Sequence, residues 1–325
     1  MTAPPGSSTA RESVQPPPHA PELGFMHRLL GRFHVTGVFW FRLHAFGVRI
    51  LPDWALGFFI ALFTTFFFLL LVRIRRAIGA NLEAALGPCG FWQRQARIYR
   101  TLWNFAWCLT ERYEGFGTDR RVKGKILDEK TWYQLLEEGQ GLILVTAHIG
   151  HWEAGASQVP MDHRRPVHVV REEEIDPRAQ AFLNELMNRD PDQNVTMHFA
   201  QSDPMLGMKL LAALRRGEIV AIQGDRPSTG GRSHEATLFG RPMSLPVGPA
   251  ALARTAGVPM LPVFVYRRGR LESEIVFREP IRVPDTRGDE VLAQATQKIA
   301  EGVEWAIRRS PHQWFCFRKL WPRDS

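Results

Sequence analysis

The chain has 325 residues, a formal net charge of +8 and 45% hydrophobic residues, which supports a sizeable folded core and excludes a disordered or fibrous protein. Its three cysteines share no metal-binding or disulfide spacing, so we expect neither a zinc knuckle nor a disulfide framework, and a reducing compartment fits best. The basic excess is compatible with an anionic partner such as phospholipid headgroups, an acidic carrier protein or nucleic acid.

The first segment, residues 1–22, is rich in proline, serine and alanine and poor in bulky apolar residues. Such a segment cannot repay the entropy of ordering, so we expect a disordered leader. It also lacks the apolar core of a secretory signal, which argues against export with cleavage. From residue 23 to residue 116 the chain becomes aromatic and basic, and we expect an N-terminal hydrophobic helical region that associates with a membrane.

The most apolar part of that region, residues 54–72, carries no charge and is closed by Arg73, Arg75 and Arg76. At about 1.5 Å per residue it is just long enough to cross roughly 30 Å of hydrocarbon. A spanning helix is slightly preferred over one lying in the interface, and burial inside the domain is the third interpretation. Basic residues flank both ends, so charge gives no orientation. A second, amphipathic helix is expected between residues 81 and 113.

Residues 117–325 alternate between strand-like and helix-like segments, and we expect them to form one α/β domain. The expected fold is a central mixed, mostly parallel sheet flanked by helices, with chemistry at the carboxyl ends of the strands. The predicted strands are 141–146, 167–171, 196–199, 219–223, 260–266 and 272–277. The predicted helices are 130–138, 152–158, 178–189, 204–215, 248–256 and 290–309.

The stretch LILVTAHIGHWEAGA runs from an apolar strand into His148, His151 and Glu153. A histidine just past a strand end, with a carboxylate in the following helix, suits a general base that removes a proton from a hydroxyl. Because no GxSxG motif accompanies it, the nucleophile would be the hydroxyl of the substrate itself. On spacing alone, a pair of loop histidines with a helix-capping acid explains the same residues equally well.

A metal site is a weaker interpretation of the same stretch. His148 and His151, with Glu153 or His163, would offer nitrogen and oxygen ligands. Their spacing matches neither HExxH nor a cysteine-rich zinc pattern. We therefore expect no metal here.

Several blocks in order resemble one family. HIGHWE is similar to the first motif of the glycerophospholipid and lysophospholipid acyltransferase superfamily, and the chain most resembles the branch of bacterial lipid A biosynthesis lauroyl and myristoyl acyltransferases. Further similar blocks, roughly from Arg75 to Pro322, are RRAIGANLEAALG, VHVVRE, IQGDRPSTGG, ATLFGRPMSLPVGPAALARTAGVPMLPVF and SPHQWFCFRKLWP. The chain departs from the branch in its Gly-Asp-Arg-Pro sequence and its long proline-rich leader, and the first departure leaves the acceptor open.

The resemblance implies that His148 is the base and Glu153 its orienting acid. It implies that Arg171 grips a phosphate or phosphopantetheine of donor or acceptor, since a guanidinium offers a charged fork of donors. Without the family, Arg171 would instead pair with the acidic run that follows it, Glu172 to Glu174.

The Gly-Asp-Arg block is assigned to the acceptor side of the site. Gly224 allows close backbone approach, Asp225 has a structural role within the substrate-binding block, and Arg226 contacts the acceptor headgroup. Phe239 and Gly240, later in the chain, would form a lip over the acyl chain. Without the family, the Gly-Asp-Arg block would be interpreted as a turn, and a simple loop explains the residues around Phe239 and Gly240 nearly as well.

Together these features predict a membrane-associated acyltransferase that moves a fatty acyl group from a thioester donor to a hydroxyl of a lipid or glycolipid. The donor would be acyl carrier protein or coenzyme A, with no other cofactor. The expected location is the inner membrane, with the catalytic domain on the cytoplasmic face. No nucleic-acid-binding motif is present. A metallohydrolase using His148 and His151 and a catalytically silent lipid-binding module stay as alternatives.

Overall fold

The structure is a computed structural model that describes most of the chain from residue 38 to residue 321. The described ranges are 38–115, 122–152, 165–173, 177–187, 194–200, 203–226, 231–286 and 288–321. The predicted leader, residues 1–22, and the greater part of the predicted helix 152–158 lie outside them.

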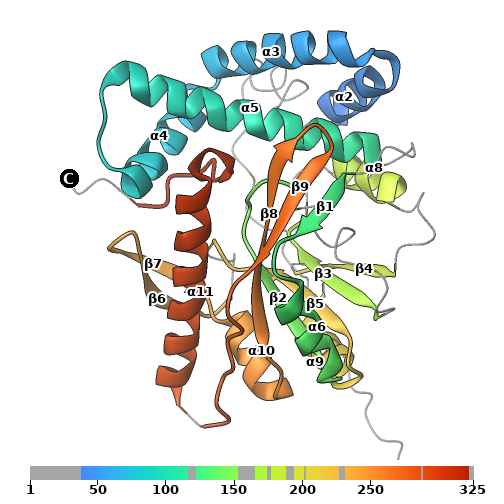
Figure 1. Ribbon diagram of the computed structural model, residues 1–325, viewed down its shortest axis with the longest axis vertical. Helices are drawn as coiled ribbons and strands as arrows, with labels where there is room; N and C mark the ends of the chain where they lie inside the picture. The colour runs from blue at the N-terminus through green and yellow to red at the C-terminus, as the bar shows by residue number, and fades with distance from the viewer. Residues whose placement is uncertain are drawn as a thin grey trace, which may run out of the picture.

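A seven-stranded sheet forms the centre of the molecule, in the order β1-β9-β8-β2-β5-β3-β4 (Figure 1). All neighbouring strands run parallel except β8 and β9, which pair antiparallel. The strands are β1 Lys123–Ile126, β2 Leu142–Thr146, β3 Val167–Arg171, β4 Val195–Phe199, β5 Ile219–Gln223, β8 Met260–Gly269 and β9 Glu272–Phe277. A separate hairpin joins β6 Ser233–Leu238 to β7 Arg241–Pro246.

Helices cover the sheet and extend beyond one end of it. They are α2 Val38–Ile50, α3 Asp53–Leu70, α4 Val72–Leu86, α5 Phe91–Gly115, α6 Glu129–Glu137, α8 Pro177–Met187, α9 Leu206–Arg215, α10 Gly248–Ala256 and α11 Asp289–Arg309. A short 3-10 turn, Pro311–Gln313, follows α11. The predicted fold class, a mixed and mostly parallel sheet flanked by helices behind an N-terminal helical region, is confirmed.

The middle strand β2 is buried on both faces, which is why its sequence is a continuous apolar run. Ile143 and Val145 point into the core that α9, α10 and α11 cover. Leu142 and Leu144 point to the opposite face, where α6 packs through Trp132. Successive side chains of a strand alternate between faces, so one strand anchors both layers.

The N-terminal helices form a layer at one end of the sheet. Figure 1 shows α3 lying along α5, which in turn meets the end of the β8–β9 hairpin. Among the described residues, α3 is the one helix long and apolar enough to cross a membrane, and 22% of it is buried. Its buried residues are Ala55, Leu56, Ile60 and Thr64.

Most predicted strands and helices are confirmed with small shifts of their ends. The apolar run 54–72 differs, because the helix breaks at Leu71, where φ is −90° and ψ is 62°. The new helix α4 begins at Val72. The strand β1 and the β6–β7 hairpin were not predicted, because their sequences alternate charged, polar and apolar residues without a clear apolar run.

Candidate active site

His148 lies at the carboxyl end of the central strand β2. The strand ends at Thr146, which is paired in register with Gln223, the last residue of the parallel neighbour β5. His148 and Asp225 each follow two residues beyond these paired strand ends. Because the strands are parallel and adjacent, the register brings the two side chains together across the sheet edge.

The two side chains form a close histidine–carboxylate pair. His148 Nδ1 lies 2.7 Å from Asp225 Oδ1, and the Asp225 side chain is 0% exposed. Burial opposes ionisation of Asp225, but the charge and hydrogen bond of His148, with the charge of Arg226, outweigh it and hold the pKa of the carboxyl well below its ordinary value. An ionised Asp225 accepts a hydrogen bond from a protonated Nδ1 of His148. Nε2 of a neutral His148 is then the basic nitrogen.

The second carboxylate oxygen of Asp225 is also occupied. The indole Nε1 of Trp314 lies 3.4 Å from Oδ2, and Arg226 Nε lies 3.8 Å from it. Asp225 was assigned above to the substrate-binding block, but its buried carboxyl group does not face solvent. The structure places it behind His148, where it holds the imidazole.

An aromatic wall surrounds the open side of His148, whose side chain is 16% exposed. The ring of Trp152 lies 5.5 Å from the His148 ring, and the ring of Phe315 lies 5.6 Å from that of Trp152. The backbone N–H of Phe315 donates to the carbonyl oxygen of His148 over 2.9 Å. These rings limit access of water to the base while leaving one edge of it reachable.

Gly224 permits the close approach of β5 to its neighbours. A Cβ added there would lie 2.9 Å from a methyl carbon of Val145 and 3.0 Å from one of Ile299. The backbone N–H of Gly224 donates to Thr146 over 2.8 Å. The backbone at Gly224 is therefore closely approached, and the groups that approach it are the core side chains of Val145 and Ile299.

Arg226 is partly exposed beside the pair. Its Nη2 donates to the carbonyl oxygen of Phe315, while Nε has no hydrogen-bond partner among the described residues. The side chain is 26% exposed. Nε is buried and faces Asp225, so Arg226 supports that carboxylate, and the exposed part of its guanidinium is what an anionic group could reach.

Arg171 ends β3, which is separated from β2 by β5. At about 4.8 Å between strands, its backbone lies roughly 10 Å from β2 at the same carboxyl edge. The structure therefore places it at the carboxyl edge of the sheet, on the strand next to β5, which leads to Asp225.

Phe239 and Gly240 form the two-residue turn of the β6–β7 hairpin, with φ values of 53° and 71°. Two positive φ values are typical of a tight hairpin turn, although a bulky residue at the first position is unusual. The Phe239 ring lies 6.2 Å from Trp314 and 6.3 Å from Trp321. The turn thus packs on the segment that supports Asp225.

Glu153 and His163 lie outside the described residues, so the role predicted for Glu153 as orienting acid stays a prediction. His151 is described, and it meets a different carboxylate from His148: its Nε2 lies 2.7 Å from Glu111 Oε2. In the part of the chain that the structure describes, no group of three or more histidine, cysteine or acidic residues could hold a metal.

A histidine held through Nδ1 by a buried carboxylate, at the carboxyl edge of a mostly parallel sheet, has the geometry for general acid–base chemistry. The sequence profile of the bacterial lipid A biosynthesis acyltransferase family matches residues 30–323. The chain belongs to that family.

Curated relatives come from mycobacteria. Phosphatidylinositol mannoside acyltransferases of two strains of Mycobacterium tuberculosis are each 27% identical over 195 residues, covering 58% of this chain and 57% of the relative. The chain therefore spans just over half the length of the curated relatives it matches. A crystal structure of a 1-acyl-sn-glycerophosphate acyltransferase from Thermotoga maritima is similar over 75% of this chain and 94% of that one, with 10% identity and a TM-score of 0.34.

Proposed function

We propose that this chain is an acyltransferase that moves a fatty acyl group from a thioester to a hydroxyl of a lipid or glycolipid, with His148 as general base oriented by Asp225. The observation that carries the proposal is the 2.7 Å contact between His148 and a fully buried Asp225. Family membership supplies the reaction class, because the matched profile is that of lipid A biosynthesis acyltransferases.

The chemistry follows from the pair. Nε2 of His148 takes the proton of the acceptor hydroxyl as its oxygen attacks the thioester carbonyl. The tetrahedral intermediate then expels the thiolate, to which the imidazolium returns the proton, and the acyl group remains as an ester. Asp225 stabilises the imidazolium while it exists.

No protein nucleophile is needed for this route. Cys316, the residue after Phe315, is 2% exposed, and burial raises the pKa of its thiol, which keeps it protonated. A single displacement by the acceptor hydroxyl is therefore the simplest mechanism. The donor would be acyl carrier protein or coenzyme A carrying the fatty acid.

The acceptor would be an anionic glycolipid or phospholipid. The partly exposed guanidinium of Arg226 would bind a phosphate close to the reacting hydroxyl, and Arg171 at the end of β3 would bind a second phosphate of donor or acceptor. Phe239, in the β6–β7 turn that packs on Trp314 and Trp321, would form part of the wall along the acyl chain. The name of the mycobacterial relatives, phosphatidylinositol mannoside acyltransferase, is one precedent for such an acceptor.

Membrane attachment would use the outer face of α2 and α3 and the start of α5. Large apolar side chains are exposed there, and they include Phe46, Ile50, Trp54, Phe58, Leu62, Leu69, Leu70, Phe91 and Trp92. Because the other face of α3 packs on α5, a helix lying in the headgroup region fits better than a spanning one. The inner membrane, approached from the cytoplasmic side, would bring a soluble thioester and a lipid together.

The test uses the purified full chain in detergent. Palmitoyl-coenzyme A and palmitoyl-loaded acyl carrier protein are the donors, and lysophosphatidic acid, phosphatidylinositol mannoside and an under-acylated lipid A precursor are the acceptors. We expect at least one combination to give an acylated lipid by mass spectrometry, and His148→Ala to lower its rate about 100-fold to 10,000-fold.

Near wild-type turnover by His148→Ala would refute the assignment of the base. Lipid binding without turnover in every combination would favour the silent lipid-binding module. Stoichiometric zinc, with loss of activity on chelation, would favour the metallohydrolase.

A further inference from the structure

The loop that carries His148 also carries His151, and it lies directly on its neighbours. Gly150 has a φ of 54°, and a Cβ added there would lie 2.2 Å from the carbonyl oxygen of Val265. The backbone N–H groups of Gly150 and His151 donate to Gln313 and Val265 over 3.0 and 2.9 Å. The loop therefore has little room to shift as long as these contacts persist.

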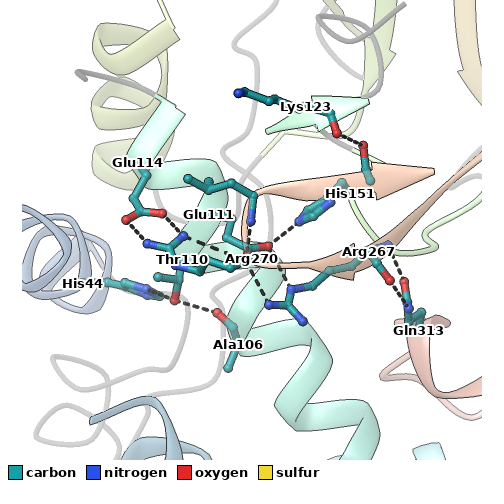
Figure 2. A network of polar contacts seen from close by, with 12 residues as sticks. His44, Ala106, Thr110, Glu111, Glu114, Lys123, His151, Arg267, Arg270 and Gln313 are labelled. Atoms are coloured by element: carbon teal, nitrogen blue, oxygen red, sulfur yellow. Dashed lines mark hydrogen bonds and ion pairs between the residues drawn. The ribbon is translucent and has the colours of Figure 1, made fainter. Parts of the chain in front are cut away.

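One side chain of this loop reaches the N-terminal helical region. His151 is 3% exposed, and its Nε2 lies 2.7 Å from Oε2 of Glu111, a residue of α5 that is 0% exposed (Figure 2). Arg267 donates to both oxygens of Glu111 over 2.9 and 3.0 Å, and the backbone N–H of Leu271 donates over 3.1 Å. A single buried carboxylate thus joins α5, the β8–β9 hairpin and the His148 loop.

Electrostatics keep this junction intact. Burial opposes ionisation of Glu111, but the hydrogen bonds from His151 and Arg267 outweigh it and lower the pKa of the carboxyl. Next to it on α5, Glu114 accepts from both terminal nitrogens of Arg270 (Figure 2). The guanidinium of Arg267 also lies 5.0 Å from the centre of the Trp107 ring. These groups hold one another in a single arrangement, because leaving any of the buried charges unpaired is costly.

We infer that Glu111 and His151 form a positioning pair for the catalytic loop, an inference that rests on the proposed role of His148. His148 is held by Asp225, which follows β5, and His151 is held by Glu111 from α5, so the two-residue segment between the histidines is fixed at both ends. His151 does not touch the reacting atoms. It acts by keeping Nε2 of His148 aimed at the acceptor, and a misplacement of about 1 Å lowers a rate by roughly 100-fold.

His151 is the residue to change, because Glu111 retains Arg267 and Leu271 as partners when the imidazole is lost. His151→Ala removes the tether, and His151→Gln keeps a donor that reaches Glu111. A matched control is His168→Ala: His168 Nε2 lies 2.8 Å from Glu218 Oε2 in a similar pair, with a side chain that is 13% exposed. That pair lies at the amino ends of β3 and β5, away from His148.

With the donor and acceptor that give the highest turnover in the panel above, we expect His151→Ala to lower kcat about 10-fold to 100-fold with KM changed less than about threefold. His151→Gln should recover most of the lost kcat, and His168→Ala should stay near wild type. Equal losses in His151→Ala and His168→Ala, or a change in KM alone, would overturn the inference.

A double variant separates positioning from general damage to the fold. If His151 acts through His148, His151→Ala should lower the rate of the wild type and leave the residual rate of His148→Ala unchanged. The same fractional loss in both backgrounds would refute the positioning role. An active His148→Ala variant would instead refute the proposed function, so the two failures are distinguishable.

Discussion

Replacing Asp225 by asparagine tests the core of the proposed site with almost no change in shape. The asparagine can turn its oxygen or its NH2 group toward His148. With NH2 toward Nδ1, that nitrogen must accept, so the proton moves to Nε2 and the imidazole is no longer a base. With the oxygen toward Nδ1, the NH2 group faces the indole N–H of Trp314, which lies 3.4 Å from the present Oδ2.

With the asparagine oxygen toward Nδ1, the NH2 group and the indole N–H of Trp314 are two donors that face each other. The orientation with NH2 toward Nδ1, in which the imidazole is not a base, is therefore favoured. We expect Asp225→Asn to lower kcat about 100-fold to 10,000-fold, the range that a positioned base contributes. The free energy of unfolding should fall by only about 1 kcal/mol, the difference between a charged and a neutral hydrogen bond. Activity should therefore be lost at a temperature where the protein is still folded.

The assay is product formation by mass spectrometry, with thermal unfolding followed in parallel. Trp314→Phe removes the opposing donor. The double variant Asp225→Asn/Trp314→Phe should therefore turn over about tenfold faster than Asp225→Asn alone, which is within the interaction energies found between neighbouring residues. Glu153→Gln is the matched change at the other candidate acid, and we expect a milder loss. Near wild-type activity of Asp225→Asn with a severe loss in Glu153→Gln would refute the Asp225 assignment.

Five other substitutions test the surrounding structure. Gly224→Ala should cost about 1–3 kcal/mol of unfolding free energy by overpacking, and lower kcat by displacing the adjacent carboxylate. Asn81→Ala should cost about 2–3 kcal/mol in chemical denaturation, because it removes buried hydrogen bonds to Cys316, Arg318 and Leu320 of the closing segment, residues 314–321. Phe58→Asp, at a side chain that is 65% exposed, should weaken vesicle binding without unfolding, whereas Ile60→Asp, at 6%, should unfold the protein. Glu111→Gln should flatten the loss of stability below about pH 4.3, since a carboxyl with a lowered folded pKa contributes its full stabilisation above its unfolded pKa and loses it as the pH falls toward the folded pKa. If Glu111→Gln lost stability at acidic pH as steeply as the wild type, the buried pair of Glu111 and His151 would be contradicted.

The alternation of apolar strands and amphipathic helices was enough to predict the sheet, because each buried strand must be apolar on both faces. It also placed His148 just past the end of β2. The partner of His148 was not predictable in the same way. Asp225 is distant in sequence, and only the strand order, which places β5 beside β2, brings it within 2.7 Å. A Gly-Asp pair two residues past another buried strand was the available signal.

The apolar run 54–72 shows a different limit of the sequence. Its length predicts a helix that can cross a membrane, but hydropathy does not record which face packs on the protein. In the structure Trp54 is 83% exposed while Leu56 is 4% exposed, because α3 lies along α5. The helix breaks at Leu71, between α3 and α4, and no proline or glycine at this position signals the break in the sequence.

The same packing bears on the predicted boundary at residues 116 and 117. Glu111 and Asn81 precede that boundary, yet Glu111 holds the loop of His148 and Asn81 holds the closing segment next to Phe315. Phe105 of α5 also lies 5.3 Å, ring to ring, from Phe315. The α/β part therefore does not contain all the contacts that shape its own site.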